Sequence, residues 1–468
     1  MTRTVWRRAA WCVGAAVAML LLPSAVTPVH GALAPAPDPY AEIVGALERE
    51  MHERGVPGAS IAIVVGDSVV LLRALGVRSV ETGDPMTPSS LVRIGSVTKM
   101  VTGLASLLAE HDGRLALDAP IGRTVPELAE PLRALTMRQL LTHTAGLGNE
   151  GAGTGSHDES ALAERVRGWG RERILAPAGD VYSYSSPGYW LAGHVLERAD
   201  GGSYVASVGR RVLAPLGMTR STFLPTVAMT HALAVDHRRG EGGRPVVVRP
   251  YPDDASTWPS GSLFSSAEEL ARLAVALLND GRVGGRQLLP PGVVRHMLEP
   301  QVPTPGGDCS YAFGLSICGV GDARVARHYG FRGGSGAVFA LVPARRLAVI
   351  VLANGPGAIM GGTEQAALDR LAPMPALPPT SPAPVASPAV AALLGRYANG
   401  GDTLQLLARG DSLRYRYGGE ESVLTVDADG SLLVGPPDAP VQGFVPVRGR
   451  TTGRWYLHDG LSAFAPID

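Results

Sequence analysis

Lysine is nearly absent from this sequence of 468 residues. Among its 42 basic residues, Lys99 is the single lysine, and all the others are arginines. An arginine keeps its proton near neutral pH, whereas a lysine that is desolvated or close to other cations can lose its proton. The retention of one lysine therefore indicates a task that arginine cannot perform, namely that of a base.

An excess of charge of one sign is also absent. The 42 basic and 42 acidic residues give a formal net charge of 0 at pH 7, so the composition gives no indication of binding to nucleic acid or to an anionic membrane surface. The chain has no strict Gly-x-Ser-x-Gly motif and no run of alternating strands and helices. These two absences argue against a conventional α/β-hydrolase.

The hydrophobic run near the N-terminus is too short to span a membrane. This uncharged run, residues 9–22, falls below the ~20 residues that a spanning helix needs, and it follows Arg3, Arg7 and Arg8. Candidate cleavage sites follow Gly31 and Ala34. We therefore expect residues 1–34 to be the signal peptide of a secreted or periplasmic protein, with no stable membrane span in the mature chain. An uncleaved membrane anchor is the alternative.

Cysteine is scarce: the chain has 3, and Cys12 lies within the expected signal peptide. An exported protein can bridge the other two, Cys309 and Cys318. The residues between them are typical of one continuous strand, which would separate their Cα atoms by ~30 Å, far beyond the ~7 Å within which a disulfide forms. On that interpretation the sequence predicts two free thiols.

Strand-like segments occur near both ends of the first 370 residues and bracket a largely helical middle. The segments at 58–65 and 69–75 form the front pair, and those at 336–342 and 347–353 form the rear pair. This order favours an α+β fold with one antiparallel sheet built from both ends, flanked by the first and last helices, and with a second, helical lobe. A cleft between the lobes is the expected place for a site.

Composition divides the chain into further segments. We expect a main domain at 38–371, an extended proline-rich linker at 372–390 and a small all-β domain, either a barrel or a sandwich, at 391–468. The last segment alternates short β-type runs with Gly, Asp and Pro turns. It contains no recognisable catalytic constellation.

Ser96 lies three residues before Lys99, at the start of an apolar segment with helical periodicity. Positions three apart share one face of a helix, so the two side chains are expected to be neighbours. A helix N-terminus has free N–H groups and a partial positive charge, which stabilise a nucleophile that becomes anionic. Because Ser-x-x-Lys alone is a weak pattern, a catalytic interpretation requires partners elsewhere in the chain.

Two later segments supply candidate partners. Tyr184 lies in a polar, aromatic loop at 177–189 just before a predicted helix, and His328 lies in a glycine-rich segment at 327–336 that precedes a predicted strand. A packed aromatic residue and a half-buried histidine at a strand end are the structural alternatives for these two side chains. Gly330 allows a backbone or a ligand to approach closely.

These three segments together resemble one family. Ser96-Val97-Thr98-Lys99, Tyr184-Ser185-Ser186 and His328-Tyr329-Gly330 are similar, in order and approximate spacing, to the motifs of the serine β-lactamase-related family. That family includes class C β-lactamases, D-alanyl-D-alanine carboxypeptidases and β-lactamase-like esterases. Segments 140–147, 259–266 and 352–355 are also similar to family segments, and the resemblance covers roughly residues 40–370. It implies a β-lactamase/transpeptidase-like fold.

The resemblance also implies a mechanism. Ser96 would attack a carbonyl group and form an acyl-enzyme, and Lys99 and Tyr184 would share the proton transfers. The backbone N–H groups of Ser96 and Phe331 would form the oxyanion hole, in which each donor typically lowers the barrier by ~3–4 kcal/mol. Neither a metal ion nor an organic cofactor is needed.

The chain departs from the family pattern at two positions. Ser186 replaces the usual asparagine of the second motif, which grips the acyl amide of a peptide or penicillin. His328 replaces the lysine of the penicillin-binding enzymes, so a permanent cation for a substrate carboxylate is missing from that position. Arg332 is the expected substitute.

Both departures favour an esterase or a D-Ala-type carboxypeptidase or peptidase over a β-lactamase. We therefore expect an exported serine hydrolase that acts on a small-molecule or peptide substrate. A β-lactamase is the alternative within this class, and a non-catalytic sensor that binds penicillin or peptide is the alternative from another class. The substrate and the oligomeric state are left open by the sequence.

Overall fold

The computed structural model describes residues 38–467, except 374–389, 411, 428–429 and 436–441. The expected signal peptide and most of the expected linker lie outside the described residues. Residues 40–468 group into one compact unit. Within the described ranges, no helix has the length and apolar character needed to cross a membrane.

The main sheet has eight antiparallel strands, and its order confirms that both ends of the domain build it. The order across the sheet is β2, β1, β14, β13, β12, β11, β10, β9. Their bounds are β1 Gly58–Val65, β2 Ser68–Gly76, β9 Val302–Pro303, β10 Cys309–Tyr311, β11 Ser316–Cys318, β12 Val325–Arg332, β13 Ser335–Val342 and β14 Leu347–Ala353.

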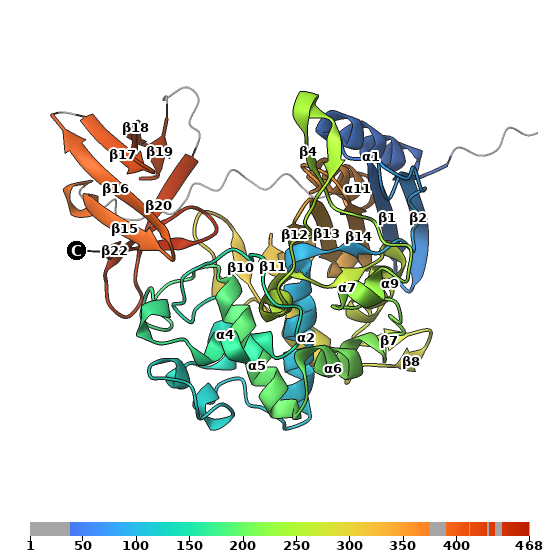
Figure 1. Ribbon diagram of the computed structural model, residues 1–468, viewed down its shortest axis with the longest axis horizontal. Coiled ribbons are helices and arrows are strands. Elements are labelled where there is room, and N and C mark those ends of the chain that lie inside the picture. Colours follow the sequence, from blue (N-terminus) through green and yellow to red (C-terminus); the bar gives the residue numbers. More distant parts are fainter. Residues whose placement is uncertain (1–37, 374–389, 411, 428–429, 436–441, 468) are drawn as a thin grey trace, which may run out of the picture. The chain divides into compact units, whose positions relative to one another are not determined.

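Strands β13 and β14 are buried on both faces because helices cover each side of the sheet. Side chains alternate along a strand, so Ala337, Phe339 and Leu341 pack into the core of the helical lobe. Val338 and Ala340 point the other way, into a second core with helices α1 (Ala41–Arg54) and α11 (Gly361–Leu371). Figure 1 shows these two helices together beside the sheet.

The helical lobe surrounds α2, in which every residue from Thr98 to Ala109 is buried. A helix that is enclosed on all sides is mostly apolar, and the polar residues that α2 buries are Thr98, Lys99, Thr102 and Ser106. The helices are α1 Ala41–Arg54, α2 Thr98–His111, α3 Met137–Leu141, α4 Ala161–Arg167, α5 Ser186–Asp200, α6 Tyr204–Val208, α7 Pro225–Ala228, α8 Trp258–Gly261, α9 Ala267–Leu278, α10 Val293–Leu298 and α11 Gly361–Leu371.

Three pairs of short strands connect these elements. They are β3 Val92–Arg93 with β6 Phe264–Ser265, β4 His237–Arg239 with β5 Pro245–Val247, and β7 Arg282–Val283 with β8 Arg286–Gln287. The pair β3–β6 joins the segment just before Ser96 to the segment just before α9.

The C-terminal segment folds as a closed eight-stranded barrel rather than a sandwich. Its strands are β15 Gly395–Asn399, β16 Asp402–Arg409, β17 Ser412–Tyr417, β18 Glu420–Val426, β19 Leu432–Val434, β20 Gln442–Arg448, β21 Trp455–His458 and β22 Ala463–Ile467. Leucine and aromatic side chains, among them Tyr415, Phe444 and Phe464, pack together in its core. An eight-stranded barrel is just wide enough for side chains to fill.

The prediction of free thiols is wrong, because Cys309 and Cys318 form a disulfide. Residues 309–318 are not one strand: β10 and β11 form a hairpin that pairs the two cysteines directly, with a Cα–Cα distance of 4.1 Å. The chain reverses at Gly314, which has a φ of +87°. The segment at 327–336 also differs from expectation, because most of it is itself strand β12.

Candidate active site

Ser96 lies in a 3₁₀ turn, Gly95–Val97, immediately before α2. Strand β12 presses its backbone against this turn. A Cβ atom on Gly330 would lie 1.9 Å from the carbonyl oxygen of Ile94, and a Cβ atom on Gly95 would lie 2.4 Å from the backbone nitrogen of Phe331. Two glycines therefore allow the main chains of Ser96 and Phe331 to lie side by side, which is the arrangement required of two oxyanion donors.

Lys99 is completely buried beside Ser96. Its Nζ lies 3.1 Å from Ser96 Oγ, donates to the carbonyl oxygen of Ser260 at 2.9 Å, and lies 3.5 Å from Ser186 Oγ. Burial, together with the positive charge of Arg332, lowers the pKa of Lys99 well below its ordinary value. No salt bridge among the described residues includes Lys99, so the neutral amine is favoured, and a neutral amine can accept the proton of Ser96.

Tyr184 completes the group from a loop more than 80 positions along the chain. Its side chain is buried and forms a hydrogen bond with Ser96. Burial raises the pKa of Tyr184 above its ordinary value, and the hydrogen bond with Ser96 only partly opposes this rise. Tyr184 is therefore a neutral phenol near pH 7 that can donate a proton. The structure brings all three predicted catalytic side chains together.

His143 packs against the loop that carries Tyr184. It was not predicted as a site residue. Its ring packs against the rings of Tyr184, Tyr311 and Tyr189, at centroid distances of 4.4, 4.6 and 5.2 Å. Its Nδ1 accepts a hydrogen bond from the backbone N–H of Ser185 at 3.0 Å. Burial lowers the pKa of His143, and positive charge on Lys99 or His328 would lower it further, so the neutral ring keeps this acceptor. His143 thus positions the loop that carries Tyr184.

His328 is a neutral, buried side chain rather than a cation. Its Nδ1 donates to the carbonyl oxygen of Tyr329 at 2.6 Å, and its Nε2 therefore accepts from Tyr311 Oη at 3.1 Å. Burial, followed by the charge of Lys99, lowers the pKa of His328 to about 3. His328 lines the same cleft as Ser96 and Tyr184, where it presents a polar but uncharged ring.

The cleft has a volume of about 540 Å³, and it includes Phe331 and Arg327 but not Arg332. Arg332 is 9% exposed. Its burial lowers the pKa of its guanidinium group, and the positive charge of Arg93 lowers it further. Along β12 the side chains alternate, so Arg327 and Arg332, five positions apart, point to opposite faces. The assignment of Arg332 to a substrate carboxylate remains a prediction, but the cation in the cleft is Arg327.

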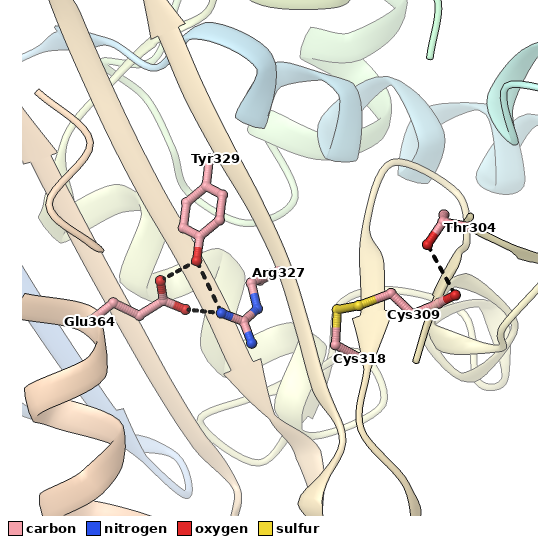
Figure 2. Close-up of a disulfide and its surroundings, with 6 residues drawn as sticks. All are labelled: Thr304, Cys309, Cys318, Arg327, Tyr329 and Glu364. Carbon is pink, nitrogen blue, oxygen red and sulfur yellow. Dashed lines mark hydrogen bonds and ion pairs between the residues drawn. A yellow bond between two sulfur atoms is a disulfide. The ribbon is translucent and has the colours of Figure 1, made fainter. Parts of the chain in front are cut away.

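Arg327 belongs to a polar group at the edge of the cleft (Figure 2). Its Nη1 donates to Tyr329 Oη at 3.0 Å and lies 3.3 Å from a carboxylate oxygen of Glu364 on α11. Tyr329 Oη donates to Glu364 at 2.7 Å. The Cys309–Cys318 disulfide also lines the cleft, so the covalent bridge fixes the hairpin that forms this wall.

Ser186 is the first residue of α5 and does not line the cleft. Its backbone N–H donates to Asn149 Oδ1 at 3.0 Å, and its hydroxyl group lies near Lys99. Asn149 was not predicted, and its own backbone N–H donates to Asn399 of the barrel at 2.7 Å. An amide side chain therefore lies next to Ser186, although it comes from another loop.

The family model described as Beta-lactamase matches residues 43–373, which is more than half of the chain. The chain belongs to the beta-lactamase family.

Within the beta-lactamase family, two relatives are similar at 31% identity. One is Penicillin-binding protein 4 of Amycolatopsis lactamdurans, aligned over 248 residues that cover 52% of this chain and 64% of that protein. The other is Esterase EstB of Burkholderia gladioli, aligned over 278 residues that cover 51% of this chain and 69% of that protein. The chain thus spans just under two thirds of the length of the first relative.

Solved structures confirm the β-lactamase/transpeptidase-like fold. SurE superposes with a TM-score of 0.76 at 28% identity, over 91% of this chain and 99% of that chain. The D-alanine carboxypeptidase AmpC from Burkholderia cenocepacia gives a TM-score of 0.60 at 21% identity over 72% of this chain and 99% of that chain, a likeness that concerns the fold alone. Because the match to SurE covers nine tenths of the chain, it extends beyond the region of the family model.

Among the residues that the structure describes, no group of three or more His, Cys, Asp and Glu side chains is arranged to hold a metal ion.

A larger cavity of about 750 Å³, lined by 148–151 and by barrel residues such as Gly400 and Ile467, does not include Ser96, Lys99 or Tyr184. The chemistry therefore places the site in the smaller cleft.

Buried neutral histidines make the folded protein sensitive to mild acid. Burial lowers the pKa of His328 to about 3 and that of His458 to about 4, and it lowers that of His143 as well. An unfolded histidine binds a proton near pH 6.5, so the unfolded state takes up protons first as the pH falls. We expect His328 and His458 each to lower the free energy of unfolding by about 2 kcal/mol between pH 7 and pH 5, and His143 to act in the same direction.

Urea unfolding at the two pH values measures this effect. His328→Asn should make the difference between pH 7 and pH 5 smaller, whereas His111→Asn, at an exposed position, should leave it unchanged. If His328→Asn has the same pH dependence as the parent, His328 does not contribute.

Proposed function

We propose that the chain is an exported serine hydrolase that forms an acyl-enzyme at Ser96 and acts on an ester or D-amino-acid peptide carbonyl. The observation that carries this proposal is the buried Lys99 amine, which lies 3.1 Å from Ser96 Oγ. A buried lysine with a lowered pKa next to a serine is the arrangement of an activated nucleophile.

The proposed reaction begins with the transfer of the Ser96 proton to Lys99. The Ser96 oxygen forms a bond with the carbonyl carbon, and the backbone N–H groups of Ser96 and Phe331 stabilise the oxyanion. The tetrahedral intermediate then breaks its bond to the leaving group, which takes a proton from Tyr184, and Lys99 returns a proton to Tyr184. In the second half, water attacks the acyl-enzyme carbonyl carbon and its proton passes to Lys99; the tetrahedral intermediate then breaks its bond to the Ser96 oxygen, which takes the proton back from Lys99.

Esters and D-amino-acid peptides are preferred to β-lactams because of the cleft's chemistry. His328 is neutral, so the third motif offers no cation to a β-lactam carboxylate, whereas Arg327 lies at the cleft's edge. One relative is named Esterase EstB, and SurE, which superposes at 26% identity and a TM-score of 0.72, has been solved with D-Leu. These names support an ester or a D-residue at the scissile carbonyl.

Export is proposed from two features. The sequence has the pattern of a signal peptide at residues 1–34, and the Cys309–Cys318 disulfide is typical of proteins in oxidising compartments. A secreted or periplasmic location accounts for both features.

Mass spectrometry of the intact protein after exposure to a fluorophosphonate, and separately to a penicillin, tests the proposal. We expect one fluorophosphonate adduct on Ser96, absent from Ser96→Ala, and hydrolysis of p-nitrophenyl acetate or of a D-alanyl-D-alanine peptide. A penicillin adduct that is hydrolysed rapidly would indicate a β-lactamase. A penicillin adduct without turnover of any substrate would indicate a sensor, and the absence of every adduct would refute the nucleophile.

A further inference from the structure

The turn between β21 and β22 of the barrel contacts the loop that carries Tyr184. The backbone N–H of Tyr184 donates to the carbonyl oxygen of Leu461 at 3.1 Å, and Ser462 Oγ donates to the carbonyl oxygen of Tyr184 at 3.2 Å. The backbone N–H of Ala463 donates to Ser183 Oγ at 3.1 Å. Both main-chain polar groups of Tyr184 are thus bonded to the barrel.

This turn has a defined conformation of its own. One carboxylate oxygen of Asp459 accepts hydrogen bonds from the backbone N–H groups of Leu461 and Ser462, at 2.9 and 2.7 Å. The backbone N–H of Gly460 donates to His458 Nδ1 at 3.0 Å, and Gly460 has a φ of +90°, which favours glycine. These bonds hold Leu461 at the tip of the turn.

Leu461 lines the substrate cleft and lies outside the barrel core. It is 50% exposed and lines the same cleft as Ser96 and Tyr184. The barrel core is filled by other side chains and does not include Leu461. Phe331, another exposed apolar side chain, lines this cleft as well. Exposed apolar side chains gathered in one cleft mark a binding surface.

We propose that Leu461 is a specificity-determining residue, through which the barrel supplies an apolar wall of the active site. On this proposal, which rests on the function proposed above, Leu461 and Phe331 contact a large aliphatic or aromatic group next to the scissile carbonyl. Substrates with such a group bind more tightly because its apolar surface leaves water. Small acetyl esters do not reach Leu461 and do not depend on it.

Two series of p-nitrophenyl and alkyl esters test this proposal, one with the acyl chain lengthened from acetyl to octanoyl and one with the alcohol lengthened. In the parent we expect kcat/KM to rise with chain length in at least one series. Leu461→Asn should lower kcat/KM for the longest ester of that series about 10-fold, mainly because KM rises. The same variant should change kcat/KM for the acetyl ester less than 3-fold.

Leu394→Asn is the matched control, because Leu394 is an exposed leucine, at 39% exposure, that lies just before β15 and outside the cleft. It should leave both series unchanged, and the melting temperatures of both variants should equal that of the parent. Suppose that Leu461→Asn has the same dependence of kcat/KM on chain length as the parent in both series, and that a fluorophosphonate still labels Ser96. That result would overturn the role of Leu461 but not the proposed function. Failure to label the parent would overturn both proposals.

Discussion

Replacement of Lys99 by methionine is expected to lower kcat/KM about 10³- to 10⁴-fold and to leave the fold intact. The methionine side chain has a similar length but no amine, so nothing accepts the Ser96 proton. Lys99 Nζ is the basic group within 3.1 Å of Ser96 Oγ, and the raised pKa of Tyr184 leaves its hydroxyl protonated and unable to replace that base. Steady-state hydrolysis of a p-nitrophenyl ester measures the loss.

The same variant should be at least as stable as the parent, and the sign follows from the lowered pKa of Lys99. The unfolded lysine binds its proton below about pH 10.4, whereas the folded amine resists protonation until a much lower pH. The folded parent therefore loses stability as the pH falls from about 10.4 toward the lowered pKa. Lys99→Met removes this penalty, so its stability relative to the parent should increase as the pH decreases.

Thr102→Val is a matched control in the same helix. Thr102 is buried one turn further along α2 and bonds to Tyr204 Oη and to the carbonyl oxygen of Pro259. Its replacement should lower the free energy of unfolding by about 1–3 kcal/mol and change kcat/KM only a few-fold. Retention of parental activity by Lys99→Met, or by Lys99→Arg, would refute the assignment of the base.

Replacement of Asp180 by alanine is expected to detach the barrel from the Tyr184 loop and to lower kcat/KM about 10- to 100-fold. Asp180 is fully buried four positions before Tyr184. Its carboxylate accepts hydrogen bonds from the backbone N–H and hydroxyl groups of Thr451 and Thr452 and from Tyr456 Oη, at distances between 2.6 and 2.9 Å. Without the carboxylate, these barrel donors lose their shared acceptor, at a cost on the order of 3 kcal/mol.

The pH dependence of this contact differs from that of the histidines. Burial by itself would raise the pKa of Asp180, but the hydrogen bonds from Thr452, Tyr456 and Thr451 outweigh it and hold the pKa well below the ordinary value. The stabilisation is therefore fully present above about pH 3.9 and is lost only as the pH falls through the lowered pKa. The contact should persist at pH 5, where the buried histidines already destabilise the fold.

Hydrogen–deuterium exchange of the amides in 451–463, together with kcat/KM, measures the effect of Asp180→Ala. Exchange in this segment should become faster, and activity should fall without loss of the melting transition. Asp369→Ala, an exposed carboxylate on α11, is the control and should change neither. Unchanged exchange and activity in Asp180→Ala would show that the barrel contact does not support Tyr184.

Local patterns in the sequence predicted the strands of the sheet and paired Ser96 with Lys99, because each depends on spacing within a short segment. Tyr184, more than 80 positions further along the chain, was linked to this pair only by the resemblance to the family's motifs. Local patterns did not identify Arg327, because the side chains of β12 that reach the cleft are determined by the pairing of β12 with β11 and β13, which the sequence does not show. The hairpin at Gly314 was likewise hidden within a run of apolar residues that is also compatible with one strand.

The contributions of the barrel were beyond the reach of such patterns. Strands β15 and β22, which close it, pair residues such as Tyr397 and Pro466 that are far apart in the chain. The role of His143 was not predicted for a related reason. Its backbone is in the left-handed region, with a φ of +59°, and only the folded loop shows that its ring packs against Tyr184.

The bonds from the β21–β22 turn to Tyr184 bear on how enzymes of this type diversify. The family match ends at residue 373, yet a hydroxyl group 278 positions beyond Tyr184 is bonded to its carbonyl oxygen. On the two proposals made above, the evolutionary unit that carries the nucleophile is smaller than the unit that carries substrate preference. Recombination that exchanges barrels between relatives would transfer a new recognition surface in one event. Point mutations in a single surface hairpin would then adjust this surface without changing the residues that carry out the reaction.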